Sequence, residues 1–156
     1  MTNDDLSAAL AQYKAGLEAE VALLQQLDAV AARQRHMTET RDLDRLAVES
    51  DERDSLMRGL ITVEETLRPV RACLQTHKQK ASALPGYAQV AELRETATTL
   101  VQRILASDQD SMKSLADAEL ARRAALASLE KGETTLAAYR KVLAPTDGAT
   151  LLDLRG

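Results

Sequence analysis

The stretch LMRGLITVEETLRPVRACL, residues 56–74, carries a regular apolar ladder that decides the fold class. Steps of four and three alternate along the ladder, whose members are Leu56, Leu60, Val63, Leu67, Val70 and Leu74. This spacing lays one apolar seam along a helix, as in coiled coils. Pro69 lies inside the ladder and removes one backbone hydrogen bond, so we expect a bend near residues 65–68 and not the end of the helix.

Two further apolar stripes accompany this ladder. The first predicts a helix from the cap-type residues Thr2 and Asn3 to about Gln34 or His36, and its members are Leu6, Leu10, Tyr13, Leu17, Val21, Leu24, Leu27 and Ala31. Pro85 and Gly86 separate the ladder from the later stripe. That stripe comprises Val90, Leu93, Ala97, Leu100, Val101, Ile104, Met112, Leu115, Ala118, Leu126, Leu129 and Leu136.

The composition favours helices over strands. The chain of 156 residues has no Phe or Trp and three Tyr, and alanine and leucine carry most of its apolar content. Alanine and leucine are good helix formers, whereas β-branched and aromatic residues favour strands. We therefore predict an all-α fold, an elongated antiparallel bundle of three long helices with coiled-coil-like packing.

The length of the last predicted helix requires a bend or an overhang. At 1.5 Å per residue, a helix over residues 88–143 would measure about 80 Å, against roughly 50 Å for the first helix. It must bend or overhang, and residues 107–110 and 131–132 are candidate breaks that would give four helices.

Gly16 lies inside the first predicted helix, where glycine costs roughly 1 kcal/mol relative to alanine. A glycine at such a position predicts the close approach of another backbone.

The turn between the first two helices is expected in HMTETRD, residues 36–42. It contains neither Gly nor Pro, and Met37 is its one apolar anchor. Thr38, Thr40 or Asp42 could cap the second helix.

Charge and hydropathy argue against several classes of protein. The 20 basic and 24 acidic residues give a net charge of −4, without the concentrated basic face that a nucleic-acid partner normally needs. The N-terminus is acidic where a signal peptide is basic, and no apolar run approaches the ~18–20 residues that span a bilayer. Cys73 is the one cysteine, so no internal disulfide can form. We expect a cytoplasmic protein.

Cys73 and His77 are the strongest candidates for chemistry, because a spacing of four places both on one helix face. A metal ion needs more ligands, and His36 is expected at the opposite end of the helical hairpin. A phosphotransfer histidine would need a nearby glycine inside the helix, which the flanks of His77 lack. We favour an interior-facing thiol beside a solvated imidazole, and we expect no catalytic residue, no cofactor, no metal and no enzyme activity.

The charged stretch ESDERDS, residues 49–55, has two interpretations. A carboxylate cluster could bind a divalent cation, but its acids point around the helix and Arg53 lies among them. We favour a solvated helix face.

The region around this charged stretch resembles the FlgN family of flagellar export chaperones, which are small cytoplasmic helical proteins. The second helix of the family typically reads Asp-Leu, a further leucine, an acid followed by a basic residue, an apolar pair and one more apolar residue. Those places are taken here by Asp42-Leu43, Leu46, Glu52-Arg53, Leu56-Met57 and Leu60. Glu49 departs from the family pattern, since an apolar residue is common there.

The sequence ends in VLAPTDGATLLDLRG, and three of its last six residues are leucine. Members of the resembled family often end with an aromatic residue, Asp or Gly, two variable positions and Gly, after a linker. The last five residues, 152–156, are similar to that motif, with Leu152 in the place of the aromatic residue. The resemblance implies a terminal region that holds cargo or docks on the export gate, with Tyr139 as the nearest aromatic alternative. We expect a helical bundle domain over residues 1–144 and a tail over residues 145–156.

Apolar residues toward the end of the chain are the candidate partner-binding site. If they extend beyond the helical hairpin, they have no cover within the chain. The predicted partner-binding residues are Leu126, Leu129, Leu136, Tyr139, Leu143, Leu151, Leu152 and Leu154.

The resemblance and the apolar end imply one function and leave one alternative. The first is a flagellar type III export chaperone that binds the helical ends of hook-associated proteins at the hook–filament junction, prevents their premature assembly and delivers them to the flagellar export apparatus. The alternative is a self-associating structural coiled-coil protein with no export role. Neither requires nucleic acid or membrane insertion. A monomer or weak homo-oligomer fits the chaperone, and a stable dimer fits the structural coiled coil.

Overall fold

The computed structural model describes residues 1–143, apart from the side chains of residues 134–136 and 139–143. It contains the helices α1 (Asn3–Thr40), α2 (Leu43–Thr76), α3 (Lys78–Ser82) and α4 (Tyr87–Leu143), and no strand occurs among those residues. The predicted all-α class is confirmed.

The chain divides into two compact units, Met1–Ser114 and Leu115–Gly156. The expected boundary between a bundle and a tail at residue 144 stays a prediction, because residues 144–156 lie outside the described part of the chain.

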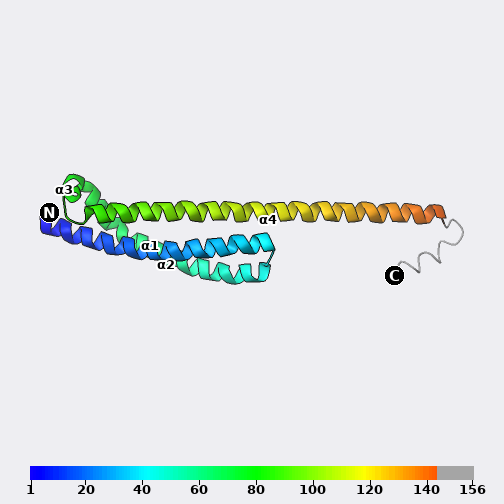
Figure 1. The fold of residues 1–156 in the computed structure, drawn as a ribbon, viewed down its shortest axis with the longest axis horizontal. Coiled ribbons are helices and arrows are strands. Elements are labelled where there is room, and N and C mark those ends of the chain that lie inside the picture. The colour runs from blue at the N-terminus through cyan, green and yellow to red at the C-terminus, as the bar shows by residue number, and fades with distance from the viewer. Residues whose placement is uncertain (144–156) are drawn as a thin grey trace. The chain divides into compact units, whose positions relative to one another are not determined.

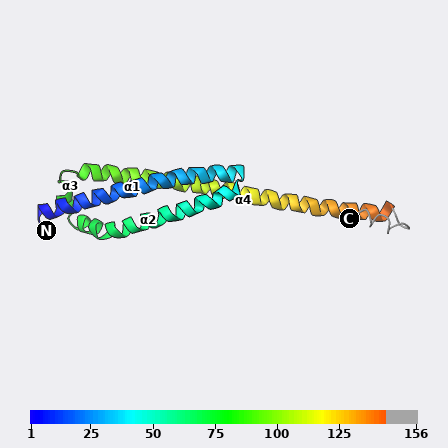
Figure 2. The same ribbon diagram turned by 90° about the horizontal axis from the view of Figure 1, so that it is seen from below.

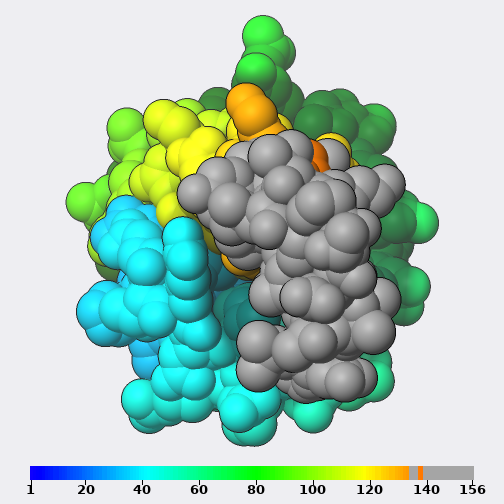
Figure 3. All heavy atoms as spheres, turned by 90° about the vertical axis from the view of Figure 1, so that its right-hand side faces the viewer, coloured from blue at the N-terminus to red at the C-terminus, as the bar shows by residue number. Residues whose placement is uncertain are grey.

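The unit Met1–Ser114 is a bundle in which α2 runs antiparallel to both α1 and the first part of α4 (Figures 1 and 2). The turn that joins α1 to α2 lies at one end of this bundle (Figure 1), the end at which cyan atoms face the viewer in Figure 3. The short helix α3 lies at the other end, before α4 begins (Figure 1). The three long helices that the sequence predicts are therefore present in this order.

The ends of the first two helices are fixed by local hydrogen bonds. A capping box starts α1, in which Asp5 N donates to Thr2 Oγ1 (3.2 Å) and Thr2 N donates to the Asp5 carboxylate (2.9 Å). Arg41 then adopts the left-handed conformation that ends α1, with φ 60°. Asp42 caps α2 by accepting a hydrogen bond from Arg45 N at 3.3 Å.

The first helix is longer than the sequence predicts. The expected end at Gln34 or His36 is wrong, because Met37 and Thr38 are buried and continue the packed face of α1 as far as Thr40. Of the three candidate caps, only Asp42 caps α2, since the Thr38 and Thr40 hydroxyls donate back to carbonyls of α1.

Two hydrophobic clusters form the core of this unit. The N-terminal cluster joins α1, the end of α2, α3 and Val90 of α4, and the second joins α1 to Ala97, Leu100 and Ile104 of α4. All eight members of the first predicted stripe are buried. In the ladder of α2, Leu67, Val70 and Leu74 are buried, whereas Leu56, Leu60 and Val63 are half-buried and pack against the clusters. Both predicted seams therefore face the core.

Pro69 does not end α2, as the ladder predicts. Pro69 and Glu65 are both exposed, and proline has no N–H to donate to the carbonyl of Glu65. The expected bend at residues 65–68 stays a prediction.

Replacing Leu56 with aspartate is expected to destabilise the bundle. Leu56 packs against the second cluster, and a carboxylate placed there would lose hydration without gaining a partner. The free energy of unfolding should fall by about 2 kcal/mol. Thermal melts followed by circular dichroism should show a melting temperature lowered by about 5–10 °C. The adjacent exposed residue gives the control, Met57→Asp, and equal melting temperatures for the two variants would contradict the assigned seam.

Gly16 accommodates a side chain and not a backbone. A Cβ atom at this position would overlap Leu67 Cδ2 and lie 2.8 Å from Leu67 Cγ. The expected approach of another backbone is therefore wrong, and the glycine instead lets the almost fully buried Leu67 of α2 lie directly on α1.

The helix α4 is uninterrupted from Tyr87 to Leu143, so both candidate breaks are wrong. In the first, Asp108 is held by Arg53 and Ser107 is buried, which gives these polar residues a place within a packed helix. In the second, a single glycine, Gly132, costs only about 1 kcal/mol and helix formers flank it. The fourth helix is instead the short α3, and α4 starts after Gly86, which has φ 93°.

Candidate functional site

The candidate site is an apolar face of α4 within the unit Leu115–Gly156. At 100° per residue, Leu115, Leu126 and Leu129 fall on one side of the helix. Their exposed fractions are 42, 45 and 66 %. We call these three side chains the α4 strip. These three leucines belong to the later part of the stripe that runs from Val90 to Leu136, where the sequence predicts an apolar surface.

A small ionic cluster interrupts the α4 strip. Glu119 accepts hydrogen bonds from Arg122 Nη2 at 2.7 Å and from Arg123 Nε at 3.1 Å. The hydrogen bonds from Arg122, with help from Arg123, lower the pKa of Glu119 to about 2. Because these charges satisfy one another along a single helix, they leave the leucines on either side as the groups that a partner could cover.

The remaining predicted partner-binding residues are only partly described. Leu136, Tyr139 and Leu143 lie in α4, but their side chains are not among those described. Leu151, Leu152 and Leu154 lie outside the described residues. Of the predicted set, the structure therefore places Leu126 and Leu129 on one exposed helix face.

The sequence interpretation missed Leu120, an exposed leucine in the described part of this unit. Leu120 is 63 % exposed, but it lies more than 100° around the helix from Leu126 and does not extend the α4 strip. The spacing did not predict it, because the stripe passes from Ala118 to Leu126 without including residue 120.

Cys73 and His77 lie where α2 ends and are linked through the backbone. Cys73 is half-buried, and its Sγ lies 3.4 Å from Met1 Sδ. His77 is the hinge residue between α2 and α3, and its N–H donates to the Cys73 carbonyl at 3.3 Å. Among the described residues, no group of three or more His, Cys, Asp or Glu is arranged to hold a metal ion.

The charged stretch 49–55 is only partly solvated. Glu49 accepts two hydrogen bonds from Arg33 of α1, each 3.0 Å long, and 17 % of its side chain is exposed. Arg53 forms a fork with Asp108 of α4, at 2.7 and 2.6 Å, and also donates to Gln34 of α1 at 2.9 Å. A solvated face is therefore wrong for Glu49 and Arg53, because neighbouring helices supply partners that the sequence of one helix does not reveal.

A second polar network lies between α1 and α2. Arg71 donates to Glu64 at 3.1 Å and to the Tyr13 hydroxyl at 3.3 Å. Glu20 Oε2 is buried and accepts no hydrogen bond among the described residues. Desolvation, followed by the hydrogen bond with Glu64 and its charge, raises the pKa of Glu20 to about 7. The hydrogen bonds from Arg71 lower the pKa of Glu64, so Glu20 is the carboxyl that holds the proton.

Replacing Glu20 with glutamine is expected to make the protein less sensitive to pH. Between about pH 4.5 and 7 the folded chain holds a proton on Glu20 that the unfolded chain has released, so this carboxyl lowers stability as the pH rises. The Glu20→Gln variant should melt at a higher temperature than the parent at pH 8, and the difference should vanish below pH 4.5. Glu18→Gln, an exposed position on the same helix, is the control. A difference that does not change between pH 4.5 and 8 would contradict the assigned titration.

Comparisons with models of protein families, with curated proteins and with solved structures give no match. No described helix combines the length and apolarity needed to cross a bilayer. The described residues form an all-α protein with a packed bundle and an exposed apolar face on α4.

Proposed function

We propose that the protein is a non-enzymatic export chaperone, which binds the helical ends of hook-associated flagellar proteins, keeps them from assembling and delivers them to the flagellar export apparatus. The proposal joins the resemblance of residues 42–60 to the FlgN family with the properties of the α4 strip.

The observation that carries the proposal is the exposure of the α4 strip. Leu126 and Leu129 are 45 and 66 % exposed, on a helix whose described part in this unit has no buried residue. Full burial of a leucine contributes about 1.5–3 kcal/mol, so covering both could contribute roughly 2–3 kcal/mol before the cost of ordering the partner.

An amphipathic helix is the partner that fits this surface best. Its own apolar face would lie along the α4 strip, with contacts at steps of three and four residues. The ends of hook-associated proteins supply such helices in the function that the resemblance implies. The charges of Glu119 and Arg122 lie on the same face and would fix the register of the bound helix, as single polar positions do in coiled coils.

Co-expression tests the proposed function. The tagged chain is produced with each hook-associated protein of a flagellated host in turn, and the complexes are purified in parallel. We expect one-to-one retention of at least one of them and no retention of a partner truncated at both helical ends. Failure to retain any would overturn the proposal.

Self-association is the alternative that one observation favours. Leu115, Leu129, Leu136 and Leu143 follow one another at multiples of seven along α4, which is the spacing of a coiled-coil seam. Light scattering at several concentrations separates the two functions. A stable dimer indicates a structural coiled coil, whereas a monomer or weak dimer that becomes a one-to-one complex with cargo indicates a chaperone.

A further inference from the structure

A small pocket in the unit Met1–Ser114 combines an apolar floor with a cationic rim. Its volume is about 130 Å³. The floor consists of side chains of the N-terminal core cluster, which are Leu10, Leu74, Ala81 and Val90, each at most 9 % exposed. The pocket lies where α1, α2, α3 and the start of α4 meet, and no residue of the α4 strip lines it.

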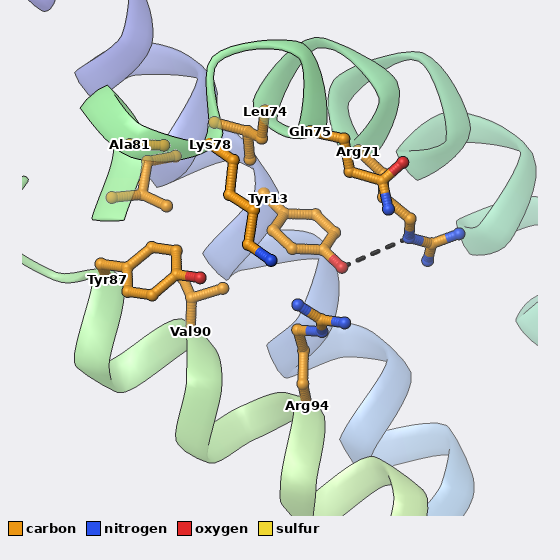
Figure 4. A pocket seen from close by; sticks show the side chains of 10 residues that line it. Tyr13, Arg71, Leu74, Gln75, Lys78, Ala81, Tyr87, Val90 and Arg94 are labelled. Atoms are coloured by element: carbon orange, nitrogen blue, oxygen red, sulfur yellow. Dashed lines mark hydrogen bonds between the residues drawn. The ribbon is translucent and has the colours of Figure 1, made fainter. Parts of the chain in front are cut away.

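The rim brings together Arg71, Lys78 and Arg94, from α2, α3 and α4 (Figure 4). No Asp or Glu lines the pocket. Glu64 neutralises Arg71, but in the described part of the chain neither Lys78 nor Arg94 has an ion pair. The positive charges of Lys78 and Arg94 on the rim of one pocket repel each other, so an anion bound between the two side chains would be attracted by both.

Tyr13 adds a hydrogen-bond donor at the centre of the rim. Its hydroxyl oxygen accepts from Arg71 Nε at 3.3 Å, and no described residue accepts the hydroxyl proton. Figure 4 shows the side chains of Lys78 and Arg94 pointing toward this hydroxyl. Tyr13 is only 5 % exposed, so its position is fixed by packing. An oxygen anion could therefore accept from the phenol and from both cations together.

We propose that this pocket binds a carboxylate carried on a short apolar stem. The carboxylate lies among Tyr13, Lys78 and Arg94, and the stem lies on the floor formed by Leu10 and Val90. A cavity of roughly 150 Å³ holds a benzene molecule, so a pocket of this size takes a stem of about four to six carbons.

The apolar floor distinguishes this ligand from inorganic phosphate. Phosphate carries oxygen on every side, and the oxygens that face Leu10 and Val90 would lose hydration without gaining a donor. A carboxylate keeps its two oxygens together at the cationic rim. The free acid and the C-terminal carboxylate of a peptide ending in leucine share this chemistry and are separated in the test.

The test follows ¹⁵N-labelled protein by NMR during titration with 4-methylpentanoate, its neutral amide 4-methylpentanamide, and inorganic phosphate. We expect saturating shifts confined to amides around Tyr13, Lys78 and Val90 with the acid, and binding at least about tenfold weaker with the amide. Equal binding of acid and amide, tighter binding of phosphate, or no saturation with the acid would each overturn the proposal. A short peptide ending in leucine binds through the same residues if its C-terminus is free, and the tighter of the two carboxylates identifies the source.

Variants at exposed residues assign the rim. Lys78→Gln and Arg94→Gln should each weaken binding of 4-methylpentanoate by about fivefold. Lys80→Gln removes a lysine of the same helix α3 that does not line the pocket, and its affinity should equal that of the parent. Because both rim residues are exposed, thermal melts should match the parent. Unchanged affinity in both rim variants, or an equal loss in Lys80→Gln, would contradict the assignment.

Discussion

The Gly16→Ala variant is expected to lower the free energy of unfolding by about 2 kcal/mol, although alanine is the better helix former. The added methyl group would overlap Leu67, which is 1 % exposed and enclosed by the core, so the two helices must separate to admit it. Chemical denaturation followed by circular dichroism measures the change.

Three further variants make this prediction specific. Gly59→Ala places the same methyl group 3.5 Å from Leu23, an ordinary contact, so it should leave stability unchanged or raise it by up to about 1 kcal/mol. Leu67→Ala alone should cost about 3 kcal/mol by leaving a cavity. In the double variant the methyl of residue 16 occupies part of that cavity, so the loss should fall below the sum of the two single losses. Additive losses would show that Gly16 and Leu67 do not share a contact.

The second large effect is expected at the α4 strip. Placing aspartate at both Leu126 and Leu129 should reduce retention of a bound hook-associated protein by more than about tenfold, because two apolar contacts become desolvated charges. Both side chains are exposed in the described structure, so the melting temperature should stay within about 2 °C of the parent value. Retention is measured by co-purification and the affinity by calorimetry.

Leu120→Asp is the matched control for the α4 strip. Leu120 is as exposed as Leu129, at 63 against 66 %, but lies on another side of α4. It should retain the partner like the parent. Equal losses in the control and the double variant would indicate a general effect of charge on α4 and would contradict a binding face at Leu126 and Leu129.

The sequence predicted the three long helices and the faces that α1 and α2 bury, because both depend on patterns within one segment. Spacings of three and four residues correctly marked the buried side of α1 and the ladder of α2. Contacts between segments were harder to predict. The polar residues at 107–110 looked like a break because the partner of Asp108, Arg53, lies 55 residues earlier in the chain. Similarly, Gly16 predicted the approach of another backbone, whereas its neighbour is the side chain of Leu67 from the next helix.

The two surfaces differ in how far the sequence predicted them. The α4 strip follows from one stripe of leucines, so Leu126 and Leu129 could be named in advance. The cationic pocket could not, because Tyr13, Arg71, Lys78 and Arg94 come from four helices and no motif links them. Their convergence depends on the turn at Pro85 and Gly86, which brings the start of α4 beside α1 and α3.

Arg53 has a further consequence for how the bundle assembles. Leucine layers that repeat every seven residues resemble one another, so a helix displaced by one heptad could still place leucine against leucine. The guanidinium of Arg53 opposes such a displacement, because its hydrogen bonds to Gln34 of α1 and to Asp108 of α4 form together only when both acceptors lie at its height. This one side chain therefore adds to the two-residue turn between α1 and α2 in fixing how the three helices align along their axes.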